Sequence, residues 1–139
     1  MATTKLNKLT RTLFSTGFAW IPIMGYGWHT YGGPIGAYYV GVAVMWVTLL
    51  MTPIIIVAFS DVFLKDYPEM RKTVAKDRPW PEWLTPWLFD SPDISLFFLA
   101  AWHGDAWLSV GACIMCLVGC YARGGREKVR RRITDGYYD

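Results

Sequence analysis

Charged residues are scarce in this sequence, and their distribution matters more than their number. Only 18% of the 139 residues are Asp, Glu, Lys or Arg, against roughly 25% in ordinary soluble domains. No charged residue occurs between Arg11 and Asp61, and the run from Ile94 to Ala122 holds one formal charge, Asp105. Two uncharged stretches of this length exclude the surface of a soluble domain. They predict an integral membrane protein.

Sequence signatures of enzyme chemistry are also missing. There is no glycine-rich phosphate loop, no hydrolytic serine elbow and no group of carboxylates within one apolar run. The three cysteines, Cys113, Cys116 and Cys120, all lie in the second run, so they predict no disulfide framework. With Ser109 they recur at helical spacing, and their small side chains favour a helix-packing face over metal or redox chemistry. We therefore expect no catalytic residue and no metal site.

Two transmembrane helices are predicted. The first occupies residues 35–60, where Pro53 should introduce a kink. The second occupies residues 92–122, begins after an N-cap at Ser91 and ends before Gly124. Each segment exceeds the ~20 residues that cross the ~30 Å hydrocarbon core. The expected fold class is an all-α membrane protein with these two transmembrane helices arranged as a hairpin.

The other segments are expected outside the lipid core. Residues 1–34 join a basic amphipathic arm to an aromatic, glycine-rich stretch, in which Pro22 and several glycines disfavour helix. An interfacial or protein-covered segment is favoured there, and a third crossing stays open. Residues 61–91 are predicted to form an extended Pro/Trp-rich docking loop, and residues 123–139 a basic tail. The loop tryptophans Trp80, Trp83 and Trp87 are the expected anchors for partner subunits.

Basic residues set the expected orientation. Lys5, Lys8 and Arg11 give the N-terminal arm a charge of +3. Residues 61–93 contain five basic and seven acidic residues and have a net charge of −2. Residues 123–139 contain six basic and three acidic residues and have a net charge of +3. The positive-inside tendency then places both termini on the matrix or cytoplasmic side and the loop opposite. The tail, with Arg130, Arg131 and Arg132, is expected to meet the head groups of anionic phospholipids such as cardiolipin, and not nucleic acid.

His103 and Asp105 are the ionisable pair inside the second apolar run. If Arg123 marks one membrane border, ~20 residues back along a continuous helix lies the other border, near His103. Trp102 and Trp107 flank the pair as an interfacial aromatic belt would. The pair is therefore expected to lie at the membrane border and to have a positional role, not a chemical one. The alternatives are a haem or quinone contact through His103, or a salt bridge to a partner subunit.

A haem held by two histidines would need His29, the only other histidine in the sequence. The two-helix topology places His29 on the side opposite His103, about a membrane thickness away. We therefore expect that these two histidines do not share one iron within this chain. Ligation together with a partner's histidine stays open.

The organisation of the chain resembles that of the supernumerary subunits of mitochondrial oxidative phosphorylation complexes. The arm MATTKLNKLTRTLFSTGFAW is basic and free of acids, as mitochondrial transit segments are. The stretch RKTVAKDRPWPEWLTPWLF after the first span is similar to the tail of a small cytochrome c oxidase subunit. The resemblance implies a non-catalytic accessory subunit in the mitochondrial inner membrane, with both termini in the matrix, of cytochrome c oxidase or complex I before ATP synthase.

Such a subunit would contact the lipid bilayer and other subunits. It would bind no small-molecule substrate and carry no cofactor of its own. The alternative function is a redox-active membrane anchor of the succinate dehydrogenase type, which binds haem or quinone.

Overall fold

The chain is described by a computed structural model that covers residues 2–76, 81 and 83–139. Within these residues all regular secondary structure is helix, and turns connect the helices. The helices are α1 (Ala2–Thr30), α2 (Ile35–Leu50), α3 (Thr52–Ala58), α4 (Asp61–Asp66), α5 (Pro68–Ala75), α6 (Thr85–Phe89), α7 (Ser91–Trp102) and α8 (Ala106–Thr134). The all-α class is therefore confirmed.

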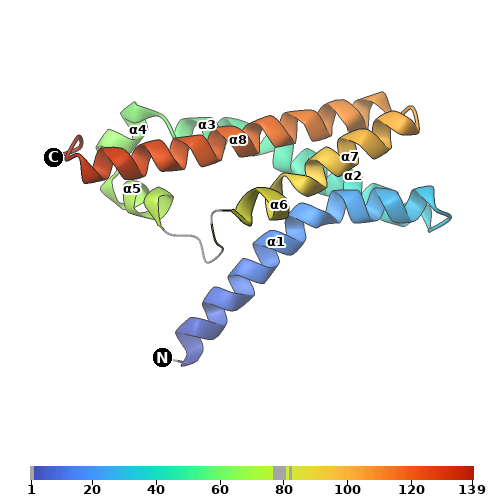
Figure 1. Ribbon diagram of the computed structural model, residues 1–139, viewed down its shortest axis with the longest axis horizontal. Coiled ribbons are helices and arrows are strands. Elements are labelled where there is room, and N and C mark those ends of the chain that lie inside the picture. Colours follow the sequence, from blue (N-terminus) through green and yellow to red (C-terminus); the bar gives the residue numbers. More distant parts are fainter. Residues whose placement is uncertain (1, 77–80, 82) are drawn as a thin grey trace.

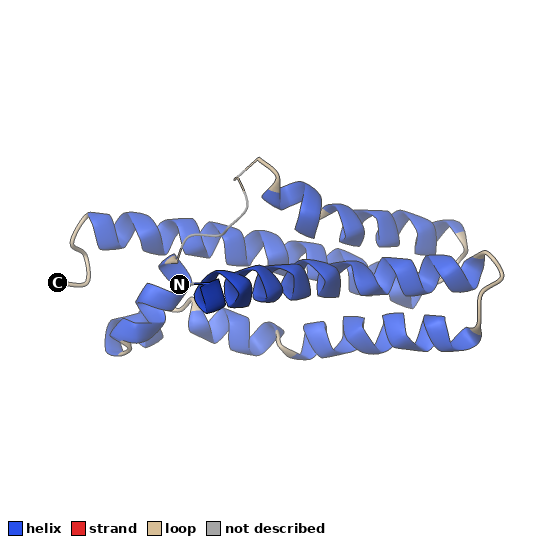
Figure 2. Cartoon of the chain, turned by 90° about the horizontal axis from the view of Figure 1, so that it is seen from below, coloured by secondary structure: helices blue, strands red, loops and turns tan. Residues whose placement is uncertain are grey.

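Four helical segments form a bundle in which the chain reverses direction three times, and the N-terminal part of α1 diverges from this bundle (Figures 1 and 2). α1 leads to a turn at residues 31–34, α2 and α3 return, α6 and α7 run forward again, and α8 returns after a turn at residues 103–105. We call the end with these two turns the turn end. The opposite end, with α4, α5 and the last part of α8, is the terminal end, and both termini point toward it (Figure 1).

This topology corrects the predicted hairpin. α2 and α8 both start at the turn end and so run in the same direction, and α1 and α7 are the neighbours that run antiparallel to them. Between the two predicted spans, α4 and α5 lie at the terminal end with the termini, and not opposite them, and α6 packs on α1 (Figure 1). Its described part is also more helical than the expected extended loop, because it contains α4, α5 and α6.

Residues 14–30 are helical, although Pro22 and the glycines predicted otherwise. The glycines are where α1 and α2 touch. A Cβ atom on Gly25 would lie 2.4 Å from the carbonyl oxygen of Ala37, and one on Gly41 would lie 2.9 Å from that of Pro22. Close packing of two backbones therefore offsets the weak helix propensity of these residues. Ala37 and Gly41 are thus the residues of α2 that let its backbone approach that of α1.

The segment 92–122 is not one helix. His103 ends α7, Gly104 has a φ of +76°, and the Asp105 side chain accepts a hydrogen bond from the Leu108 amide at 3.2 Å. A left-handed glycine followed by an N-cap aspartate is a helix stop followed by a helix start. The prediction that His103 and Asp105 lie within one continuous helix is therefore wrong, and α7 and α8 pack against each other as an antiparallel pair.

The second helix was predicted to end before Gly124, but α8 continues to Thr134. Gly125 lies directly beneath Phe59, whose ring a Cβ atom would approach to 2.7 Å. Packing on this side holds the helix together across the two glycines. The first span breaks as Pro53 predicted, since α2 ends and α3 begins around Met51.

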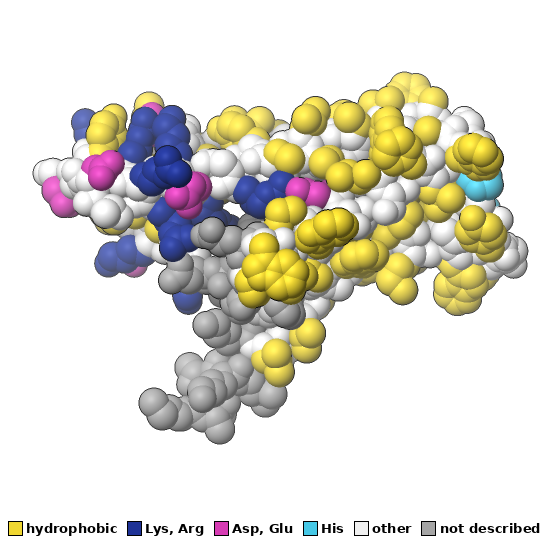
Figure 3. All heavy atoms as spheres, viewed as in Figure 1, with side chains coloured by type: hydrophobic (Ala, Val, Ile, Leu, Met, Phe, Trp, Pro, Cys, Tyr) yellow, Lys and Arg dark blue, Asp and Glu magenta, His cyan; other side chains and the backbone are white. Residues whose placement is uncertain are grey.

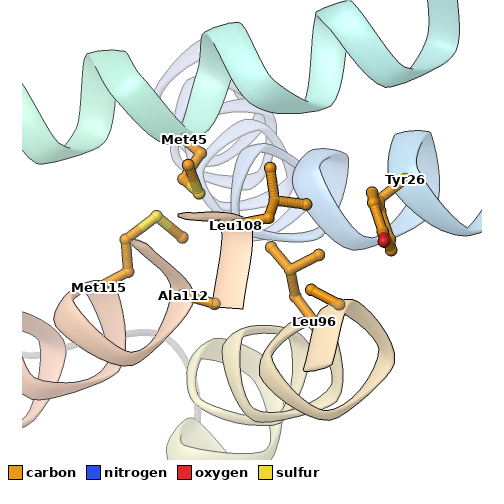
Figure 4. Close-up of a cluster of buried hydrophobic side chains, with 7 residues drawn as sticks. Tyr26, Met45, Leu96, Leu108, Ala112 and Met115 are labelled. Carbon is orange, nitrogen blue, oxygen red and sulfur yellow. The ribbon is translucent and has the colours of Figure 1, made fainter. Parts of the chain in front are cut away.

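Two hydrophobic clusters hold the chain together. The first lies inside the bundle and takes side chains from all four segments: Tyr26, Met45, Leu96, Ala100, Leu108, Ala112 and Met115. Figure 4 shows them converging between the helices. The second lies at the terminal end, where Leu64 of α4 and Val74 of α5 pack on Val129 of α8. Among the described helices, α8 alone contributes buried side chains to both clusters.

Candidate functional site

The outward surface of the bundle is its most extensive candidate interaction site. Ile35–Ala58 and Ala106–Thr134 are each long and apolar enough to cross a membrane, which confirms the expectation of two candidate spans. In the most apolar part of the first, only 11% of the residues are buried inside the protein. Figure 3 shows apolar side chains over the turn-end part of the molecule and charges gathered toward the terminal end. The apolar residues of these helices therefore need an environment that the chain itself does not supply.

Exposed aromatic residues lie at both limits of this apolar surface. At the turn end Trp102 is 86% and Trp107 84% exposed. Trp83, just before α6, and Trp87, within α6, are also exposed. Trp80, the third predicted loop anchor, lies outside the described residues. Tryptophans at two levels of an apolar helical surface are typical of the two membrane–water interfaces.

A shallow, open pocket of about 630 Å³ lies at the turn end, and we call it the turn-end pocket. It is lined by both histidines together with aromatic and polar side chains from the two turns: Tyr26, His29, Thr30, Tyr38, His103, Gly104, Asp105, Ala106 and Trp107. The expectation that His29 and His103 lie on opposite sides is therefore wrong. α1 and α7 both end at this turn end, and that parallel arrangement brings together two residues far apart in the sequence.

Asp105 links the walls of the turn-end pocket. One carboxylate oxygen caps α8 through the Leu108 amide, and the other accepts a hydrogen bond from the Tyr38 hydroxyl of α2 at 3.3 Å. The His29 ring lies 5.5 Å from the Tyr38 ring, centroid to centroid, and its Nδ1 lies 3.3 Å from the carbonyl oxygen of Gly33. His103 is exposed at the end of α7. Asp105 thus joins α2 to the turn between α7 and α8.

The predicted packing face on α8 is only partly buried. Ser109 is buried and donates a hydrogen bond to the carbonyl oxygen of Phe97 at 3.2 Å, which ties α8 to α7. Cys116 is half-buried, whereas Cys113 and Cys120 are exposed, and all three are free thiols. The buried positions of α8 in the bundle core are Leu108, Ala112 and Met115. Only part of the small-residue stripe therefore faces another helix.

An ion pair that the sequence did not predict joins α8 to the start of α7. The Arg123 guanidinium donates to both carboxylate oxygens of Asp90 at 2.5 Å, and it also lies 3.1 Å from the Cys120 sulfur. The ligand atoms of Asp90, Cys116 and Cys120 lie within 4.8 Å of one another, as in a metal site. Because the guanidinium already occupies both oxygens of Asp90, this group is an internal ion pair with two neighbouring thiols.

The predicted lipid-facing arginines are engaged within the protein. Arg131 pairs with Glu127 at 3.1 Å, and Arg132 pairs with Asp61 and stacks on the Tyr137 ring. Arg130 borders a shallow pocket on the same helix. Arg132 thereby fastens α8 to α4, so the basic tail contributes to the fold of the terminal end as well as to its charge.

The chain matches no protein-family model, no curated protein and no solved structure with which it was compared.

Proposed function

We propose that this chain is an integral membrane protein and a non-catalytic accessory subunit of a larger membrane complex. The observation that carries the proposal is the outward-facing apolar surface of the two candidate spans, bounded by exposed tryptophans. Burial of such a surface in lipid or against apolar helices contributes about 25 cal/mol per Å². A surface of this kind holds a protein in the membrane and offers contact area to partners.

The finer assignment rests on charge and composition. The basic, acid-free N-terminal arm favours the mitochondrial inner membrane, and a respiratory complex is the host that the overall organisation suggests. Trp83 and Trp87 support docking, because each is a large exposed aromatic residue on the border between the apolar surface and the charged terminal end. Trp80 shares this stretch of sequence.

Incorporation into the complex is the test of this proposal. The tagged full-length chain would be followed by native electrophoresis of mild-detergent extracts, as wild type and as Trp83→Ala, Trp87→Ala and Trp46→Ala. We expect a high-mass species that either loop variant reduces several-fold, since a truncated tryptophan anchor commonly costs at least ~2 kcal/mol of interface energy. Trp46 is exposed near the middle of the candidate span Ile35–Ala58 and serves as the control. Normal incorporation of both loop variants would refute the docking role.

The turn-end pocket favours a second candidate function, a redox-active membrane anchor that binds haem. Ligation of one iron by two histidines requires both imidazoles in one cavity, and both histidines of the chain line this pocket. Haemin titration of the purified protein would give the spectrum of a six-coordinate haem, and His29→Ala and His103→Ala would each abolish it. An identical spectrum in the double variant would exclude the pocket as the haem site.

A further inference from the structure

We propose that the whole bundle is embedded in a lipid bilayer, so that α1 and the α6–α7 segment cross it together with α2–α3 and α8. The turn end then faces the compartment opposite to both termini. The proposal rests on the membrane location argued above and goes beyond the two candidate spans. It names the bilayer as the partner of two further helical faces and orients the molecule in it.

Chain direction requires the α7 crossing. α2–α3 and α8 both begin at the turn end and finish at the terminal end. If both cross a bilayer, the chain must return through the same thickness between Ser60 and Asp105. The α6–α7 segment is the described part of the chain that makes this return, and it packs along α8 and α1. Two parallel spans in one chain always need such a third crossing between them.

α1 completes the bundle on the other side of α2. Its outward face is apolar wherever it packs on the bundle, as Met24 and Trp28 show, and it stays apolar at Phe14, which is 74% exposed. On α7 the exposed side chains include Ile94 and Phe98. These faces carry no charged residue, because the sequence from Thr12 to Ser60 and from Ile94 to Trp102 has none. An aqueous environment on one side of the bundle would leave them unpartnered.

The thickness of the apolar zone fits a bilayer. Along α8 the distance from Asp105 to Arg123 is 18 residues, or about 27 Å of helix at 1.5 Å per residue, close to the ~30 Å hydrocarbon core. On α1 the span from Phe14 to Thr30 is about 24 Å by the same rise. The Asp90–Arg123 pair lies at one limit of this zone, so that α6 lies at the border and α7 within the zone, and the turn-end pocket lies at the other limit. The Asp90–Arg123 pair, with Asp93 in the first turn of α7, therefore lies at one border and Asp105 at the other, where desolvation of charged groups is least costly.

Charge sets the orientation. Lys and Arg occur only at residues 5–11, 65–78 and 123–132. In the bundle topology all three segments belong to the terminal end, apart from Arg78, which lies outside the described residues. Asp105 is the one formal charge of the segments at the turn end. By the positive-inside rule the terminal end faces the cytoplasm or matrix, and the turn-end pocket opens to the other side.

Single-cysteine labelling tests the crossings. In a variant with Cys113, Cys116 and Cys120 replaced by serine, a cysteine would be placed in turn at the exposed positions Asn7, Tyr31, Lys72, Trp102 and Thr134. A membrane-impermeant maleimide would be added to sealed vesicles of each orientation. We expect Tyr31 and Trp102 to label from one side, and Asn7, Lys72 and Thr134 from the other.

Each contrary pattern has one meaning. Labelling of Trp102 together with Lys72 would overturn the α7 crossing, and labelling of Asn7 together with Tyr31 would overturn the α1 crossing. Complete inversion of the pattern would overturn the orientation alone. Release of the wild-type chain by alkaline carbonate would instead refute the membrane location, and with it the proposed function, so the two failures are distinguishable.

Discussion

Replacing Gly25 with alanine should push α1 and α2 apart. The added Cβ atom would lie 2.4 Å from the Ala37 carbonyl oxygen and 3.2 Å from the Gly41 backbone nitrogen. Both neighbours are backbone atoms, which move only if the whole helix moves. Overpacking of this kind costs about 1–3 kcal/mol, whereas alanine in place of glycine inside a helix contributes up to ~1 kcal/mol of stability. The net expectation for Gly25→Ala is a loss of stability.

Two other glycines on the same helices provide matched controls. Gly17 on α1 and Gly36 on α2 have no atom within 4 Å of an added Cβ. Gly17→Ala and Gly36→Ala should therefore be neutral or slightly stabilising, through helix propensity alone. The difference between Gly25→Ala and either control is then about 1–3 kcal/mol, or roughly 3–9 °C in melting temperature for a chain of this size.

The assay is thermal unfolding of the purified full-length protein in a mild detergent, followed by far-ultraviolet circular dichroism. Gly41→Ala should behave as Gly25→Ala does, because its Cβ would meet the Pro22 carbonyl oxygen at 2.9 Å from the opposite side of the same contact. Equal melting temperatures for Gly25→Ala and Gly17→Ala would show that the α1–α2 contact is looser than the structure has it. The packing argument for α1 would then fail.

Two further predictions use the same assay. Asp90→Asn should lower the melting temperature more than Asp61→Asn, because the Asp90 side chain is 14% exposed and doubly paired with Arg123, whereas that of Asp61 is 49% exposed; a larger effect at Asp61 would contradict this order. Asp105→Ala should lower the free energy of unfolding by about 1 kcal/mol or more, since it removes the cap of α8 and the Tyr38 contact. His103→Gln should leave the melting temperature unchanged. His103→Gln and Asp105→Asn should each leave the turnover of the assembled complex within about twofold of wild type. A tenfold loss of turnover at normal complex abundance would show that these residues take part in the chemistry.

Local signals in the sequence predicted the first span well. The uncharged run from 35 to 60 sets its extent, and the steric effect of Pro53 on the preceding turn explains the break near Met51. The same kind of signal was present at Gly104 and Asp105, where a helix stop precedes an N-cap. The apolar character of the whole run outweighed this signal. One long helix was therefore predicted, whereas the structure has two, α7 and α8.

Tertiary contacts account for what the sequence could not predict. Pro22 and Gly25 disfavour helix in isolation, but packing against α2 stabilises α1 through them. The Asp90–Arg123 pair joins residues 33 positions apart, and their proximity follows only once α7 and α8 are known to be antiparallel. The presence of His29 and His103 in one pocket likewise depends on chain direction. In the predicted two-span chain one crossing separates the two histidines, which places them at opposite ends. In the bundle the chain runs along its length twice between them, through α2–α3 and then α6–α7, so both lie at the turn end.

The continuity of α8 has a mechanical consequence. Its first half is fixed in the bundle core, and its second half carries α4 and α5 through the Leu64, Val74 and Val129 cluster. With no break in its 29 residues, the helix is a stiff rod about 43 Å long. A tilt of about 10° at the turn end would therefore sweep its far end through roughly 7 Å. A change in the tilt of α8 at the turn end would therefore displace α4 and α5, which pack on the opposite end of this helix.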